Sequence, residues 1–449
     1  MNPTTTHQPI LRDLGDGLIL RRSSPADADA LADFCGRIHS DEGFDHPDLR
    51  IAAWARDLLT KPHPTFQPDD FSVVAEAATG RIVSTLNLIS QTWTYEGIPF
   101  GVGRPELVGT LPEYRNRGLV RLQMDEVHRW SAARGQMVQA ITGIPYYYRL
   151  FGYEMGLDLD GGRGGFAPSI PALKDGELEP FSIRPATEAD IPFLMDLYQQ
   201  AAARSEVYAV RPEAMWRYDL LERSPSSVGC GDWEIIERAA DGDPVGALMR
   251  PNYASRDTMF VMRYELKAGV SWLEVNPSVL RHLWSICQTP DPETGKVRTA
   301  YTFLLGQEHP VYALMGASLP QIRKPYAWYA RVPDLPAFLR HVAPALEARL
   351  ERSIAVGYSG EVKISFYKTG LRLVFERGKL VTVEGWRPAP EDDGHAAFPD
   401  LTFLQILFGY RSLQELRLSF ADCWWQTETI RALLEILFPK KNSSVLGIM

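Results

Sequence analysis

A short basic loop is the first stretch whose residues and spacing point to chemistry. The run Glu106–Arg121 reads E-L-V-G-T-L-P-E-Y-R-N-R-G-L-V-R, and it predicts a strand over 107–111, a break at Pro112, a basic loop over 115–118 and then a helix. The first amides of a helix have no intrahelical partners, and the helix dipole adds partial positive charge there. Gly118 has no side chain, so a phosphate group can approach the backbone closely. The stretch therefore predicts an anion site.

A cluster of tyrosines follows the next predicted strand, which covers residues 137–142. Residues 146–153 read Y-Y-Y-R-L-F-G-Y. A phenol, with a reference pKa of about 10, can act as a proton donor. The three adjacent tyrosines, Tyr146, Tyr147 and Tyr148, are candidates for such a donor, and an aromatic core residue is the structural alternative.

These two segments resemble the signatures of the GCN5-related N-acetyltransferases. The family's acetyl-CoA loop is written R/Q-x-x-G-x-G/A, and here it reads Arg115-x-x-Gly118-x-Val120, with a valine at the last small position. The segment Y-x-x-F-G-Y, Tyr148–Tyr153, resembles the second signature, which lies beside the pantetheine of CoA. The resemblance implies direct transfer of an acetyl group from acetyl-CoA to an amine in a ternary complex. The residues predicted to bind the co-substrate are Val108, Gly109, Thr110, Asn116, Arg117, Gly118, Leu119, Val120, Arg121, Gly143 and Ile144.

Each part of this predicted site has a physical role. The amides of residues 116–121 would bind the pyrophosphate. An amide on the strand over 108–110 could hold the thioester carbonyl, and Gly109 could permit the local strand distortion that opens a cleft. No metal is predicted, because the four cysteines (Cys35, Cys230, Cys287 and Cys423) are far apart and form no C-x-x-C pair.

A repeated pattern suggests two domains of one design. Arg21-x-x-Ser24-x-Ala-Asp matches Arg184-x-x-Thr187-x-Ala-Asp position for position, each after a predicted strand. The serine or threonine is a plausible helix cap. The predicted domains span 18–165 and 181–333, with a Gly- and Pro-rich linker over 161–180. In the second copy Ser271–Pro277 is predicted as the equivalent strand and proline, but no R-x-x-G follows, so we expect one CoA site per chain.

Residues 334–449 show a different order of predicted helices and strands. An amphipathic helix is predicted over 335–350, alternating strands over 362–367, 371–376 and 380–384, and helices over 401–416 and 428–438. This order resembles the sterol-carrier fold. The predicted fold class is therefore α/β (α+β), with two tandem acetyltransferase-like mixed-sheet domains and a C-terminal sterol-carrier-like domain.

The three predicted domains in this order resemble the Eis type of N-acetyltransferase. That type acetylates amines, including aminoglycosides and lysine side chains, and assembles into rings of six. The resemblance implies a homo-oligomer, Tyr148 as general acid and the terminal carboxylate, here that of Met449, as base. The tail after Lys441 does not match the family's usual ending. Glu106 and a water relay are therefore alternatives for the base.

Composition excludes several classes of protein. The net charge of −9 argues against nucleic-acid binding, and no apolar run approaches the roughly 18 residues of a membrane span. The N-terminus shows no signal-peptide design, so a cytoplasmic location is expected. The acceptor amine stays open among aminoglycosides, polyamines, peptide lysines and small metabolites. The alternative function is a non-catalytic protein that binds acyl-CoA or a lipid through its C-terminal domain.

Overall fold

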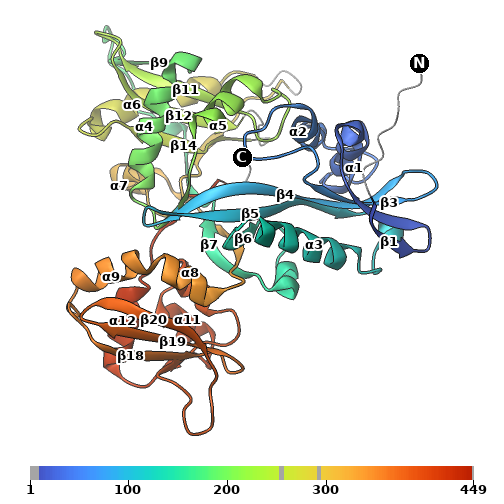
Figure 1. The fold of residues 1–449 in the computed structure, drawn as a ribbon. Helices are drawn as coiled ribbons and strands as arrows, with labels where there is room; N and C mark the ends of the chain where they lie inside the picture. Colours follow the sequence, from blue (N-terminus) through green and yellow to red (C-terminus); the bar gives the residue numbers. More distant parts are fainter. Residues whose placement is uncertain (1–9, 252–256, 291–294, 447–449) are drawn as a thin grey trace.

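The structure is a computed structural model that describes residues 10–251, 257–290 and 295–446. A long mixed sheet lies at its centre, a second α/β unit lies on one side of it, and the C-terminal unit lies on the other side (Figure 1). This arrangement of mixed sheets and helices confirms the predicted α/β fold class.

The central sheet has the strand order β1-β2-β3-β4-β5-β6-β17-β7, and β10 pairs with the far end of β4. Helices α1 and α2 lie on one face of the sheet and α3 lies on the other (Figure 1). The elements are β1 (Ile10–Gly15), β2 (Leu18–Arg22), β3 (Phe71–Glu76), β4 (Ile82–Tyr95), β5 (Ile98–Thr110), β6 (Val138–Ile141), β7 (Glu154–Leu159), β10 (Val207–Ala209) and β17 (Tyr326–Arg331), with α1 (Ala28–Ile38), α2 (Leu49–Thr60) and α3 (Leu119–Ala133).

Apolar periodicity in the sequence explains how the helices cover the sheet. Leu31 and Phe34 of α1 are buried in one core with residues of β3. Met124 and Val127 of α3 are buried in another core, with Leu86 and Leu88 of β4 among its members. Apolar side chains that alternate along a strand lie on one face of the sheet, and apolar side chains that recur every three or four residues lie on one face of a helix. These two apolar faces pack against each other.

The second unit contains two four-stranded sheets, ordered β14-β12-β11-β9 and β13-β15-β8-β16. Its strand β8 comes from the sequence before the second copy begins, and β17, which follows that unit, joins the central sheet between β6 and β7. The elements are β8 (Gly162–Phe166), β9 (Phe181–Pro185), β11 (Gly231–Arg238), β12 (Pro244–Pro251), β13 (Thr258–Val261), β14 (Arg263–Leu266), β15 (Ala300–Phe303) and β16 (Gln321–Arg323), with α4 (Ile191–Ala202), α5 (Glu213–Arg217), α6 (Trp272–Cys287) and α7 (Pro310–Met315).

The two copies of the R-x-x-S/T-x-A-D pattern make the same local structure. Arg21 donates to both carboxylate oxygens of Asp27 at 2.8 and 2.7 Å, and Arg184 does the same to Asp190 at 2.8 Å each. In each copy the aspartate also forms a capping box with the serine or threonine three residues before it. The repeated sequence pattern thus corresponds to a repeated ion pair, the arginine–aspartate fork, between an arginine on a strand and an aspartate at the start of the following helix.

Two predictions about the second copy and its surroundings were wrong. Ser271–Pro277 was predicted as a strand, but residues 272–287 form helix α6 with Pro277 inside it. Val275, Val279 and Leu283 recur every four residues and are fully buried, so burial of this stripe outweighs the missing proline amide. The predicted linker over 161–180 contains β8, whose glycines lie too close to neighbouring strands for a side chain.

The C-terminal unit has a sheet ordered β20-β19-β18-β21-β22, and its core is continuous with that of β4, β5 and β17. The predicted helices over 335–350 and 401–416 are each broken into two. The first breaks where Val342 departs from helical geometry and Pro344 enters the next helix. The elements are α8 (Leu335–His341), α9 (Ala343–Glu351), β18 (Gly360–Ser365), β19 (Gly370–Glu376), β20 (Lys379–Trp386), β21 (Ala396–Ala397), α10 (Phe403–Leu407), α11 (Leu413–Ser419), β22 (Trp424–Trp425) and α12 (Glu428–Leu437).

Within the described residues, every helix is too short or too polar to cross a membrane.

Candidate active site

The site is an opening between two neighbouring strands of the central sheet. Strands β5 and β6 run parallel but pair only near their starts, where Val102 lies opposite Val138 and Gly103 opposite Gln139. Both strands continue beyond this pairing, and their later residues line a cleft of about 770 Å³. Where the two strands separate, backbone N–H and C=O groups of β5 have no strand partner on that side. A bound substrate can form hydrogen bonds with these groups.

A bulge in β5 lies at the centre of the cleft. The pairing of β4 with β5 loses register between Glu106 and Gly109, and Leu107 has a positive φ of 53°. A non-glycine residue rarely adopts this conformation, and such bulges reorient the backbone groups beside them. The predicted distortion near Gly109 is therefore present, and it is centred on Leu107. The backbone of Val108 is freed to face the cleft.

The predicted anion loop forms one end of the same cleft. Gly118 caps α3 with φ of 73°, and Asn116 also has a positive φ, 63°. The first residues of α3 line the cleft, so the unpaired amides at this helix start are available to an anion bound there. Arg115 fixes the loop by donating to the carbonyl of Thr110 at 3.3 Å. A Cβ built on Gly118 would meet no atom within 4 Å, so the space in front of the loop is open.

Most of the predicted co-substrate residues come together here. The cleft is lined by Val108, Gly109, Thr110, Asn116, Gly118, Leu119, Val120, Arg121, Gly143, Ile144 and Tyr148. Arg117 is not among the lining residues; its guanidinium lies 4.9 Å from the ring centre of Tyr114. Met449 lies outside the described residues.

Tyr148 is the buried member of the tyrosine cluster. Its side chain is only 4% exposed and packs against the rings of Tyr147, Tyr153 and Tyr329, whereas Tyr146 is 70% exposed. The hydroxyl lies 3.5 Å from the position that a Cβ on Gly143 would take. Burial, aided by the charge of Glu106, raises the pKa of Tyr148 above its usual value, so the phenol keeps its proton at neutral pH.

Glu106 is held by an ion pair at the wall of the cleft. Its carboxylate accepts from Arg104 Nη2 at 2.5 Å, and the guanidinium lies 4.7 Å from the ring of Trp328 on β17. Burial raises the pKa of Glu106, and the charge of Arg104 opposes that shift. This pair links the cleft to the strand that follows the second unit.

Several lining residues were not predicted from the sequence. They include His39 at the end of α1, Ile51 and Trp54 on α2, and Val228 from the second unit. The Val228 amide donates to the carbonyl of Arg50 at 3.1 Å, which docks the second unit onto α2. In the sequence the α2 residues read as ordinary core positions. The place of Val228 depends on packing between units, for which the sequence holds no local signal.

The C-terminal tail runs between the units toward this region. Ser444 donates its amide to the carbonyl of Val207, and the Val445 carbonyl accepts from Trp328 Nε1 at 3.2 Å. Val445 and Leu446 are both 7% exposed. The last described residues therefore pack against Trp328, the ring on which Arg104 lies.

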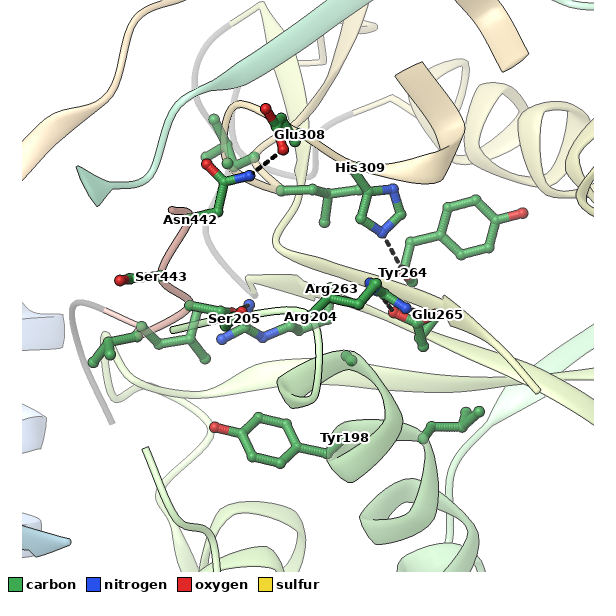
Figure 2. A pocket seen from close by; sticks show the side chains of 18 of the residues that line it. Tyr198, Arg204, Ser205, Arg263, Tyr264, Glu265, Glu308, His309, Asn442 and Ser443 are labelled. Carbon is green, nitrogen blue, oxygen red and sulfur yellow. Dashed lines mark hydrogen bonds and ion pairs between the residues drawn. The ribbon is translucent and has the colours of Figure 1, made fainter. Parts of the chain in front are cut away.

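A second cavity of about 410 Å³ lies along this tail and within the second unit (Figure 2). Asn442 reaches across it to donate to Glu308 at 2.6 Å, and Arg263 donates to Ser444 Oγ at 3.2 Å. Among the residues that the structure describes, none lines both this cavity and the cleft beside β5. The contacts across it fix the path of the tail.

Comparison with known proteins agrees with this geometry. Residues 39–156 match the acetyltransferase (GNAT) domain family. No curated protein matches the sequence.

Solved structures share the fold over nearly the whole chain. A protein of Enterococcus faecalis V583 described as a probable N-acyltransferase has a TM-score of 0.65 at 14% identity, covering 96% of this chain and 100% of its own. A GCN5-related N-acetyltransferase from Kribbella flavida has a TM-score of 0.61 at 18% identity, with 96% and 98% covered. Eis1 from Mycobacterium abscessus has a TM-score of 0.58 at 13% identity, with 96% and 99% covered. At these identities the likeness is one of fold.

Proposed function

We propose that this protein transfers an acetyl group from acetyl-CoA to a primary amine, directly and within a ternary complex. The observation that carries the proposal is the cleft between β5 and β6, which brings the phosphate-binding loop, the bulged strand and Tyr148 into one space. The match of residues 39–156 to a GNAT domain supports the same class of reaction.

Each group of residues along the cleft has a separate proposed role in binding or catalysis. The amides at the start of α3 would hold the pyrophosphate, and the open space at Gly118 fits a group of that size. The Val108 amide would polarise the thioester carbonyl, which makes its carbon more reactive. Tyr148 would give its proton to the departing sulfur, and its raised pKa ensures that the proton is present. Acetyl-CoA supplies the activated acyl group.

The base has three candidates from the sequence. Met449 could reach the site, since the tail is directed toward Trp328 and Arg104 up to Leu446. Glu106 lines the cleft but is engaged with Arg104. A water relay is the third candidate.

One acetyl-CoA is expected to bind per chain. In the second unit the segment after β14 leads into α6 without an R-x-x-G loop, and the first turns of that helix carry Trp272 packed against Tyr264. Calorimetric titration with CoA should give a stoichiometry near one. A stoichiometry near two would show that the second unit also binds CoA.

The proposal is tested by a screen of amines. Aminoglycosides, polyamines, lysine peptides and small amines are each incubated with acetyl-CoA, and free thiol is followed. At least one class should release thiol at a rate that depends on protein and amine together. Tight CoA binding without amine-dependent release from any class would favour the alternative, a non-catalytic acyl-CoA- or lipid-binding protein.

The remaining architecture is proposed on resemblance. An Eis-type arrangement implies tandem acetyltransferase-like units, a sterol-carrier-like C-terminal unit and a cytoplasmic homo-oligomer of six chains. The oligomer is checked by light scattering.

A further inference from the structure

The end of helix α1 lies unusually close to the bulged strand. A Cβ built on Gly109 would lie 2.7 Å from Cγ2 of Ile38 and 3.1 Å from Cε1 of Phe34, so α1 can pack here only because residue 109 has no side chain. The next residue, His39, caps α1 and lines the cleft. Gly109 thus brings an imidazole to the bulge.

The imidazole of His39 is held in its neutral form. Its Nε2 atom is enclosed by protein and makes no well-aligned hydrogen bond. The ring's polar contact is with the backbone of Leu107, and this contact favours protonation, as a carbonyl acceptor does. Burial is the larger effect and lowers the pKa of His39 below its usual value. Because Nε2 is enclosed by protein and the residue lines the cleft, Nδ1 is the ring nitrogen that could accept a proton from a bound group.

We propose that His39 is the general base of the reaction, taking a proton at Nδ1 from the ammonium group of the acceptor. The inference rests on the proposed acetyl transfer. The bulge places the imidazole against Leu107, and the next residue, Val108, has the amide assigned to the thioester carbonyl. The apolar side chains of Ile51, Trp54 and Val228 form the adjoining wall, along which the rest of the amine lies.

The competing groups are less suited to accept this proton. Protonation of Glu106 would cost the charge pairing of its 2.5 Å contact with Arg104 in a buried setting. The neutral imidazole has no ion pair to lose. The titratable and charged groups on the elements around His39 are Asp33 and Arg37 on α1, Asp48 and Arg50 at the start of α2, Glu106 on β5, Arg115 in the loop, and Tyr147 and Tyr148. None of these is a cause of its pKa shift.

The protons balance over one cycle. His39 takes one proton from the ammonium, which leaves a neutral amine to form the N–C bond as the C–S bond breaks. Tyr148 gives its proton to sulfur and receives the second proton that the nitrogen releases. The products are an amide and a thiol, and His39 passes its proton to water.

The expected pH dependence follows from the direction of the shift. A base with a lowered pKa is active above that pKa and is lost as the pH falls through it. For the wild type, kcat/KM should therefore fall only below about pH 6.5, the reference value for histidine. His39→Gln should lower kcat by roughly 10²-fold or more and should remove this acid limb, with the Kd for CoA unchanged within about twofold.

Matched variants separate a base from a structural role. His46→Gln changes an exposed histidine in the adjoining loop and should leave the whole pH profile unchanged. Imidazole added to His39→Ala should restore part of the turnover, which a purely structural residue would not show. Retention of the acid limb at the same pH in His39→Gln would overturn the inference.

A second variant tests the alternative at the chain end. Two residues appended after Met449 displace its carboxylate, and this variant should keep the wild-type pH profile. Loss of turnover in the extended chain, with His39→Gln remaining active, would assign the base to Met449 instead. If the wild type acetylates no amine at any pH, the proposed function itself fails, and that outcome is distinct from either result.

Discussion

Phenylalanine in place of Tyr148 is expected to lower turnover by roughly 10²–10⁴-fold, the usual cost of losing a general acid. The change removes only the hydroxyl, and the ring contacts with Tyr147, Tyr153 and Tyr329 can be kept. Single-turnover rates with saturating acetyl-CoA measure the effect, and calorimetry should show an almost unchanged Kd for CoA.

Tyr147→Phe is the matched control for this result. Tyr147 also lines the cleft and lies beside Tyr148, but its side chain is more exposed. Its variant should keep most of the activity. Near-normal turnover in Tyr148→Phe together with a collapse in Tyr147→Phe would move the acid to Tyr147.

Aspartate in place of Gly118 should abolish CoA binding. The new carboxylate would stand at the start of α3, where the pyrophosphate is expected, and repulsion between like charges there is on the order of several kcal/mol, or more than about a hundredfold in Kd. A second effect is strain, because residue 118 has φ of 73°. Isothermal titration with CoA measures the loss.

Gly135→Asp separates repulsion from strain. Gly135 follows the other end of α3, has a similar φ of 67°, and like Gly118 has no atom within 4 Å of a built Cβ. This variant should share the strain and melt at a similarly lowered temperature, yet bind CoA normally. Equal loss of CoA binding in both variants would mean that the effect at residue 118 is one of folding, and the loop would not be the pyrophosphate site.

The parts of the site that are local in sequence could be predicted from it. The order of strand, proline, basic loop and helix depends on neighbouring residues, and the structure has all four between Ile98 and Ala133. The arginine–aspartate fork at 21 and 27 was likewise visible as a repeated spacing. Among the predicted loop residues Arg117 is the exception, because its guanidinium packs over the ring of Tyr114.

The parts that depend on long-range packing could not be predicted. The exchange of β8 and β17 between the units follows from pairing across more than a hundred residues, as between Tyr301 and Gly165. His39 reads as a polar residue at the end of a helix, and only the contact of α1 with Gly109 places it in the cleft. Pro277 was taken as a break, although the buried stripe around it formed a helix.

The central claim is that the cleft between β5 and β6 moves an acetyl group from a thioester to an amine. The most direct measurement is quantification by mass spectrometry of acetylated amine together with free thiol, for the wild type and for Tyr148→Phe under the same conditions. The account predicts equal amounts of the two products with the wild type and a loss of both in the variant. Thiol without acetylated amine, or acetylated amine formed equally well by the variant, would contradict it.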